Sequence, residues 1–245
     1  MQKYEVKVFG NDERVYKVTD FVADGKTYMD AIGIVFGTPI IGLRVLAFGC
    51  SLAEWGLVEW SKTKTNSIIT ESHNEAQAVQ ILCGLEDTRR IVDAQNLNDE
   101  TTAAKWCWQY RRGDCQWYLP SLMELGVLFL ARDQINDAMK QLGCCSDCLL
   151  PTKNSDKTWV WSSSEYSQYG SWSMGFDNGY FLNGGKCFNL VVRAVAAPFS
   201  QSYSPNLFLG EAKSKDSKMS DEEIISILRS RGYTGGLKLT KTLVV

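Results

Sequence analysis

The sequence predicts an α+β fold in which short strands alternate with amphipathic helices. Two β-rich apolar pieces, AIGIVFG at residues 31–37 and GLRVLAFG at residues 42–49, are predicted core strands. A capping box of Ser121 and Glu124 begins a helix that is expected to end at Gly143. Hydrophobic residues make up 44% of the 245-residue chain and charged residues 22%, which is typical of a globular protein and not of a disordered one.

Further elements are predicted before and between these. Residues 3–9 alternate polar and apolar side chains as a half-buried strand does, and residues 15–21 read as a second strand. This opening hairpin is either the edge of the main domain or a small attachment element. Residues 71–85 and 99–112 carry apolar side chains at helical spacing, so each segment is a predicted helix.

The chain is predicted to consist of three parts. Residues 1–25 are the N-terminal strands or attachment element, residues 26–199 the main domain, and residues 200–245 a polar linker with a short helix. In that last part, Ser220 and Glu223 form a capping box before an apolar stripe. A helix of this length is marginal alone, so we expect it to dock on its own domain, on another subunit or on a larger assembly.

Composition argues against several classes of protein. The net charge of −2 disfavours broad nucleic-acid binding, and no apolar run is long enough to span a bilayer. The N-terminal residues carry no secretory signature. The run CCSDC lacks the second half of a zinc site, and His73 is remote in sequence, so no metal, no cofactor and no catalytic group is predicted.

Residues 159–199 are the most distinctive stretch of the chain. They are rich in Trp, Tyr, Ser, Gly and Asn and poor in charge, a composition typical of a binding surface. Trp172, Met174 and Phe176 alternate, so they are predicted to face the core from one side of a strand. Ser173, Gly175 and Asp177 would then face the opposite side.

Several motifs occur together in one order: QYRRGDCQ, WYLPSLMELGVL, QINDAMKQLG, WVWSSSEYS, SWSMGFDNG and VVRAVAAPF. Taken together, they resemble the C-type-lectin-like fold in its formylglycine-generating-enzyme-like branch, and within it the variable proteins that diversity-generating retroelements diversify. The resemblance is strong over residues 88–199. It implies a domain in which two helices flank small antiparallel sheets and the last strands and loops carry a ligand-binding face.

The resemblance also implies which residues vary. Diversification acts on adenines in codons that commonly end in a pyrimidine, and such codons never encode Trp, Met, Lys, Glu or Gln. Glu165, Trp172, Met174 and Lys186 therefore suit a fixed scaffold, whereas Gln168 is an exception, and variable residues are expected within residues 168–190. Among the anchors of that face, Phe188 is expected to be the most internal. The predicted ligand-binding residues are Tyr169, Ser171, Ser173, Gly175, Asp177, Asn178, Tyr180, Phe181, Leu182, Asn183, Cys187, Phe188 and Asn189.

The resemblance implies a phage tail receptor-binding protein located in the virion. The expected partners are a host cell-surface protein or glycan, and tail or virion proteins that bind the C-terminal helix or the N-terminal strands; homo-oligomer formation is a further expectation. A bacterial surface or secreted adhesin of the same fold is the alternative. A formylglycine-generating oxidase would need a reactive cysteine pair near the C-terminal end of the fold, where Cys187 stands alone. A calcium-dependent lectin would need Glu-Pro-Asn or Gln-Pro-Asp and Trp-Asn-Asp tripeptides, and none occurs.

Overall fold

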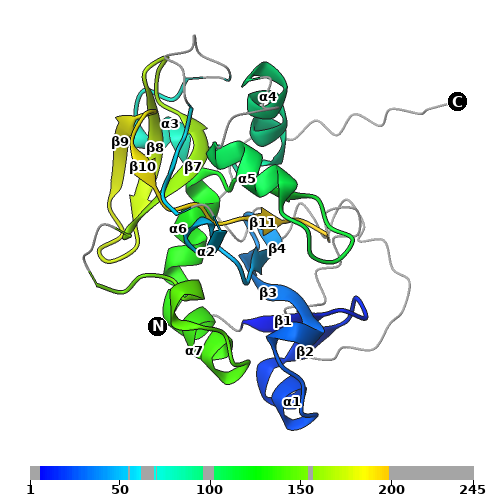
Figure 1. Ribbon diagram of the computed structural model, residues 1–245. Coiled ribbons are helices and arrows are strands. Elements are labelled where there is room, and N and C mark those ends of the chain that lie inside the picture. The colour runs from blue at the N-terminus through cyan, green and yellow to red at the C-terminus, as the bar shows by residue number, and fades with distance from the viewer. Residues whose placement is uncertain are drawn as a thin grey trace, which may run out of the picture. The chain divides into compact units, whose positions relative to one another are not determined.

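The computed structural model describes residues 6–54, 56–61, 69, 71–95, 102–153 and 157–198. The chain divides into two units, residues 1–203 and 204–245, and all of the described residues lie in the first. The predicted C-terminal helix lies outside the described residues. The first unit is an α+β structure whose strands pair in small antiparallel sheets (Figure 1). In chain order its elements are β1 (Lys7–Gly10), β2 (Val15–Lys17), α1 (Val18–Ala23), η1 (Tyr28–Asp30), β3 (Ala31–Thr38), β4 (Gly42–Ala47), α2 (Ser51–Glu54), β5 (Val58–Glu59), α3 (Glu75–Ala78), α4 (Leu85–Gln95), α5 (Ala103–Gln109), β6 (Trp117–Tyr118), α6 (Leu122–Leu130), α7 (Arg132–Gln141), η2 (Ser146–Cys148), β7 (Trp159–Glu165), β8 (Gly170–Gly175), β9 (Phe181–Gly185), β10 (Asn189–Leu190) and β11 (Val195–Ala196).

The larger sheet has six strands in the order β2-β1-β3-β4-β11-β6. The two predicted core strands are confirmed as β3 and β4, and both faces of this pair are buried. Ile34 and Leu46 belong to one apolar core, and Val35 and Val45 belong to a second core rich in tryptophan. Because neighbouring residues point to opposite faces, a strand buried on both sides reads as the continuous apolar run seen here.

The opening hairpin is part of the main sheet. β1 pairs with β2 and with β3, and Val8 and Phe21 are buried in the first core. The boundary predicted at residue 25 therefore does not separate an attachment element from the domain. The prediction of a strand over residues 15–21 is wrong beyond Lys17, because the chain turns into α1 and buries Phe21 from a helix.

The helices follow the predictions unevenly. The capping box is confirmed, since the Ser121 side chain accepts from the Glu124 backbone N–H and the Glu124 side chain accepts from that of Ser121. The single helix expected up to Gly143 is instead two helices, α6 and α7, with a break at Ala131. The helix expected over residues 71–85 is wrong for most of its length. Only α3 forms there, and α4 begins at its end.

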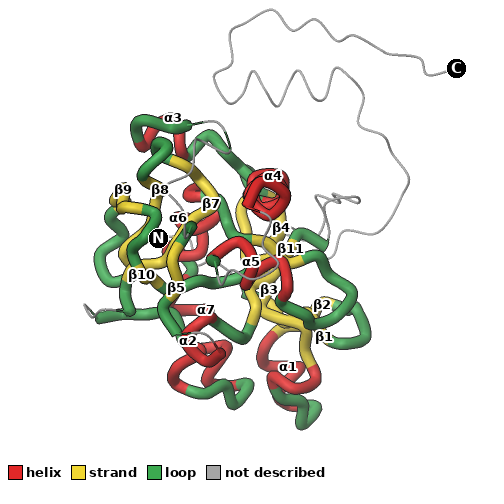
Figure 2. Tube along the Cα trace, turned by 45° about the horizontal axis from the view of Figure 1, so that its top comes forward, coloured by secondary structure: helices red, strands yellow, loops and turns green. Residues whose placement is uncertain are grey.

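The smaller sheet has the order β7-β8-β9, and β10 pairs separately with β5. Helix α6 contacts β7 and β8 of the smaller sheet and β3 of the larger one, so it lies between the two sheets (Figures 1 and 2). The first core also contains Trp172 and Met174 of β8 and the adjacent Phe176, as predicted. Among the described residues, none of the helices is both long and apolar enough to cross a membrane.

A buried carboxylate stabilises the junction between the helix and the larger sheet. Glu124 accepts from Arg44 Nε at 2.5 Å and from the Tyr118 hydroxyl at 2.7 Å. Its other oxygen accepts from the backbone N–H groups of Ser121 and Gly84. Burial raises the pKa of Tyr118, which keeps this phenol protonated as a donor. With all of these partners in place, the charge of Glu124 is compensated and fixes α6 in position.

Candidate ligand-binding surface

The central strand of the smaller sheet is buried on both faces. Ser171 is fully buried, Ser173 is 1% exposed and Gly175 is also buried. Opposite them in register lie Glu165 and Trp161, which are fully buried as well. The prediction that Ser171, Ser173 and Gly175 belong to the displayed face is therefore wrong. It assumed that one face of this antiparallel sheet meets solvent, as is common, but only the edge strand β9 does so here.

The exposed surface lies along β9 and the turns at its two ends. Tyr180 and Leu182 alternate with inward residues, and they are 71% and 51% exposed. Phe188 follows β9 and is 56% exposed, and Tyr169 precedes β8 and is 59% exposed. We call these four residues the β9 face. Four large side chains that stay in solvent along one sheet edge are unusual for a scaffold and typical of a contact surface.

The predicted set is split between the two sides of β9. Phe181 pairs in register with Met174, and Asn183 pairs with Trp172, so both side chains lie on the α6 side of the sheet. Phe181 is only partly exposed and packs against the first core, so the expectation that it belongs to the displayed face is wrong. Asn183 remains exposed, but on the opposite side from Leu182. This alternation of inward and outward residues is the ordinary consequence of a pleated strand.

The expectation that Phe188 is internal is also wrong. The backbone turns after β9, where the Phe188 N–H donates to the Gly185 carbonyl at 2.9 Å. The Phe188 ring lies beside two glycines, and a Cβ atom on Gly184 would come within 3.3 Å of it. The adjacent Cys187 and Asn189 are exposed. The ring therefore covers backbone that has no side chains of its own, while its other side faces solvent.

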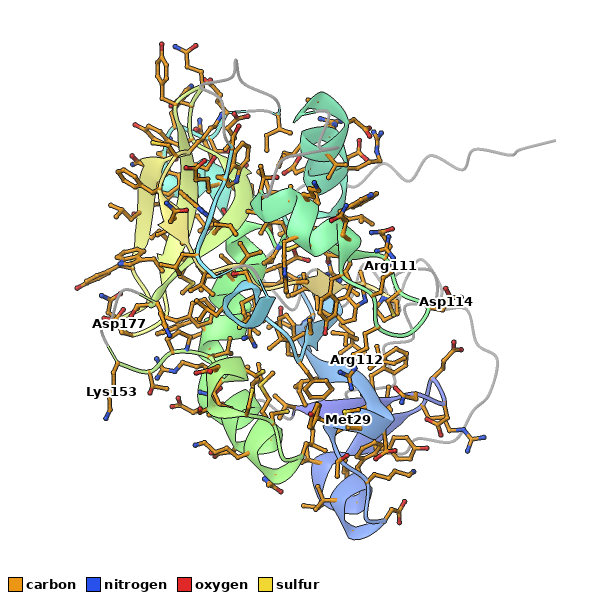
Figure 3. The ribbon with its side chains drawn as sticks, in the orientation of Figure 1. Met29, Arg111, Arg112, Asp114, Lys153 and Asp177 are labelled. Atoms are coloured by element: carbon orange, nitrogen blue, oxygen red, sulfur yellow. The ribbon has the colours of Figure 1, made fainter. Side chains whose placement is uncertain are left out.

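The loop between β8 and β9, which carries Asp177 (Figure 3), positions Tyr180 through two hydrogen bonds. The Asn178 side-chain oxygen accepts from the Tyr180 N–H at 2.9 Å, and the Tyr180 carbonyl accepts from Gly175. Asn178 is exposed, while one carboxylate oxygen of Asp177 is buried without a hydrogen-bond partner among the described residues. Gly179 has a φ of +79°, which only glycine adopts without strain.

Replacing Gly179 with alanine should lower the free energy of unfolding by more than the roughly 1–2 kcal/mol that a left-handed backbone costs a residue with a Cβ. The added Cβ would lie 2.7 Å from the Phe129 ring, so the loop or that ring must also shift. Gly25→Ala is the matched control, because Gly25 has a φ of +74° with open space around it. Urea denaturation should show a larger loss for Gly179→Ala. Equal losses would contradict the placement of Gly179 against Phe129.

A buried ion pair fixes the turn that carries Phe188. Lys186, 3% exposed, pairs with the fully buried Glu165 of β7. The Lys186 ammonium also lies 4.8 Å from the centre of the Trp60 ring. The four residues expected to be fixed, Glu165, Trp172, Met174 and Lys186, are all buried. Sequence reasoning missed that the first and last of them pair, although a lone lysine in a stretch poor in charge was a usable signal.

Other candidate groups lie apart from this surface or have ordinary roles. His73 is exposed, lies 3.2 Å from a Glu71 carboxylate oxygen and makes an edge contact with Tyr166. Within the described ranges, no group of three or more His, Cys, Asp or Glu side chains is placed to hold a metal ion. The arrangement along β9 offers aromatic and aliphatic area with amide groups beside it, which suits recognition by contact.

Comparisons with known proteins give one likeness of fold. A scan against protein-family models finds no match, and a search of curated proteins finds none either. Among solved structures, the chain is similar to a fimbrial protein from Bacteroides ovatus ATCC 8483, with a TM-score of 0.53 and 13% sequence identity. The match covers 80% of this chain but 48% of the other, so this chain spans about half the length of that protein. At this identity the likeness concerns the fold alone.

Proposed function

We propose that this chain is a ligand-binding protein that contacts its ligand through the β9 face. The observation that carries the proposal is the exposure of Tyr169, Tyr180, Leu182 and Phe188 on β9 and on the turns at its two ends. Aromatic side chains contribute large contact areas with little loss of rotamer entropy, so they are common anchors of interfaces. Asn178, Cys187 and Asn189 are exposed beside them, and the two amides can hydrogen-bond a ligand.

We further propose that the domain has the C-type-lectin-like fold and that its β9 face varies between relatives. The support is positional. The residue types that the expected codons exclude are buried at positions 165, 172, 174 and 186, with the exposed Gln168 as the exception. The exposed Tyr169, Tyr180, Leu182 and Phe188 are of types that those codons reach. The buried Ser171 and Ser173 are of reachable types too, so the variable positions are fewer than the sequence predicts.

Two settings remain for such a protein. The resemblance of the sequence to retroelement-diversified proteins favours receptor binding at a phage tail, and this is our leading proposal. The fimbrial protein that shares the fold favours an adhesin on a bacterial surface. The coding DNA tests the resemblance to retroelement-diversified proteins. A second, near-identical copy of the segment for residues 159–199, with adenines at the differing positions and a reverse transcriptase gene nearby, is expected if the resemblance holds, and their absence would leave a generic lectin-like domain.

The binding proposal is tested with the fluorescently labelled full chain on a panel of bacterial strains and on arrays of glycans and cell-surface proteins. For any target that binds, the double variant Tyr180→Ala/Phe188→Ala should weaken binding at least about tenfold, because each truncated anchor of an interface typically costs more than about 1 kcal/mol. Flow cytometry across a concentration series measures the change on cells.

The matched control is the double variant Met29→Ala/Ile40→Ala, which removes two side chains that are 63% and 62% exposed. Met29 lies beside β3 and Arg112, away from the smaller sheet (Figure 3). This control should bind as the unmodified chain does. Equal losses in both double variants, or a loss only in the control, would place the binding surface elsewhere.

A further inference from the structure

A pair of cysteines lies close together in the loop after α7, away from the β9 face. Cys145 precedes the short turn η2 and Cys148 ends it, and their sulfur atoms are 2.9 Å apart. This separation is short even for a thiol–thiol hydrogen bond, and two sulfurs so placed need little movement to join. Cys145 is exposed, whereas Cys148 is partly buried. One sulfur is thus open to a reactant in solution and the other lies directly behind it.

The two thiols also differ in acidity, and the exposed thiol of Cys145 is the more acidic one. A hydrogen bond from the Cys148 side chain, followed by backbone N–H groups of Cys148 and Asp147, lowers the pKa of Cys145. Burial, together with the hydrogen bond to Cys145, raises the pKa of Cys148 to about 12. Of the two thiols, Cys145 is therefore the one that loses its proton first as the pH rises. Because the thiolate is the nucleophile, Cys145 is the sulfur prepared to attack.

A buried cation lies beside the pair. Arg193 is 1% exposed, and its Nη1 donates to the Cys148 carbonyl at 2.8 Å. Its Nε and Nη2 have no hydrogen-bond partner within the described part of the chain. Buried charges are normally compensated, so a guanidinium with two nitrogens unpartnered among the described residues is a distinctive feature. Its positive charge favours negative charge on the nearby sulfur of Cys148, against the effect of burial.

Two further hydrogen bonds hold the loop that carries the pair. The buried Cys50 thiol donates to the Asp147 carbonyl at 3.3 Å, and the Leu149 N–H donates to the Ser146 carbonyl. The adjacent Cys144 is partly buried, and burial raises its pKa to about 11. Cys144 and Cys50 are therefore poor competitors, and the geometry selects one pair out of the four cysteines in this region.

We propose that Cys145 and Cys148 form a thiol–disulfide exchange site, in which Cys145 attacks and Cys148 resolves. The oxidant is a disulfide, RSSR. The Cys145 thiolate attacks one of its sulfurs, which breaks the S–S bond, releases RS⁻ and leaves a mixed disulfide on Cys145. Cys148 then loses its proton to solvent and attacks the Cys145 sulfur. The second RS⁻ leaves, the dithiol is oxidised to an intramolecular disulfide, and the oxidant is reduced to two thiols.

The test uses the reduced full chain with oxidised glutathione, followed by alkylation and peptide mass mapping. The unmodified chain should acquire a bond between residues 145 and 148 and release two glutathione molecules. Cys148→Ser should stop at a stable glutathione adduct on Cys145. Cys145→Ser should react more slowly in this segment, because the remaining Cys148 thiol is partly buried and burial raises its pKa.

Cys187→Ser is the matched control, because Cys187 is an exposed cysteine that follows β9 and is no part of the loop after α7. This variant should form the bond between residues 145 and 148 at an unchanged rate. Circular dichroism of each variant checks that the fold is kept. The proposal is overturned if Cys145 in the Cys148→Ser variant takes up glutathione no faster than Cys187 does. It is also overturned if the bond forms instead to Cys144 or Cys50.

Discussion

Trp172→Ala should lower the free energy of unfolding by about 3–5 kcal/mol, as large-to-small changes in a core do. Trp172 is 4% exposed and packs in the first core. Its indole N–H also donates to the Ser72 carbonyl at 2.8 Å. Its ring makes an edge contact with the Tyr166 ring, with 5.4 Å between the ring centres. The substitution removes the packing, leaves a buried carbonyl without its donor and frees the segment before α3. Urea denaturation measures the loss. Far-UV circular dichroism is the signal, because the substitution itself changes the tryptophan fluorescence.

Tyr180→Ala is the control for that change, because it removes a large aromatic side chain that is 71% exposed. Its unfolding free energy should stay within about 0.5 kcal/mol of the unmodified protein, as for most surface substitutions. If Tyr180→Ala destabilises the protein as much as Trp172→Ala does, the assignment of one residue to the scaffold and the other to the β9 face is wrong.

Lys186→Met should also destabilise the protein by about 3–5 kcal/mol, because removing one partner of a buried ion pair is strongly destabilising. The Glu165 carboxylate is fully buried and would keep its hydrogen bond from the Ile69 N–H at 2.9 Å but lose the opposing charge. The turn that carries Phe188 loses its anchor at the same time. Chemical denaturation measures the change in stability, and the binding assay on cells reports the turn.

Arg89→Met removes one partner of an exposed pair and is the matched control. Arg89 and Glu86 are joined at 2.7 Å on the surface of α4, with side chains 50% and 54% exposed. Exposed ion pairs contribute at most about 1 kcal/mol, so this variant should remain nearly as stable as the unmodified protein. A loss for Lys186→Met that is no larger than this would mean that the ion pair with Glu165 does not fix the turn.

The sequence predicted the parts of the fold that depend on local signals. The apolar runs of β3 and β4 and the capping box at Ser121 were confirmed because side-chain periodicity and cap chemistry are written in neighbouring residues. The break at Ala131 and the turn of the chain into α1 after Lys17 were missed. In both places tertiary packing overrides a local pattern that fits either structure.

The sequence located the stretch that carries the candidate site, but it misplaced several residues of that stretch, mainly for one physical reason. Alternation along β8 separated Trp172 and Met174 from Ser171 and Ser173 correctly, but it carried no information on what covers the second face. That face is closed by Trp161 of β7 and by the Glu165–Lys186 pair, which are contacts between segments distant in sequence. Phe188 was misplaced because its burial depends on the turn after Gly185, not on strand periodicity.

The most direct test of the division into scaffold and β9 face compares two libraries of variants of this chain, each displayed on the surface of yeast cells. One randomises Tyr180, Leu182 and Phe188, and the other randomises Ser171, Ser173 and Gly175, three buried members of the same predicted set. The measurement is the fraction of clones in each library that resists protease. We expect most clones of the first library to stay folded and few of the second, because side chains added to a packed interior cost about 1–3 kcal/mol each. Equal fractions, or a reversed order, would contradict the account.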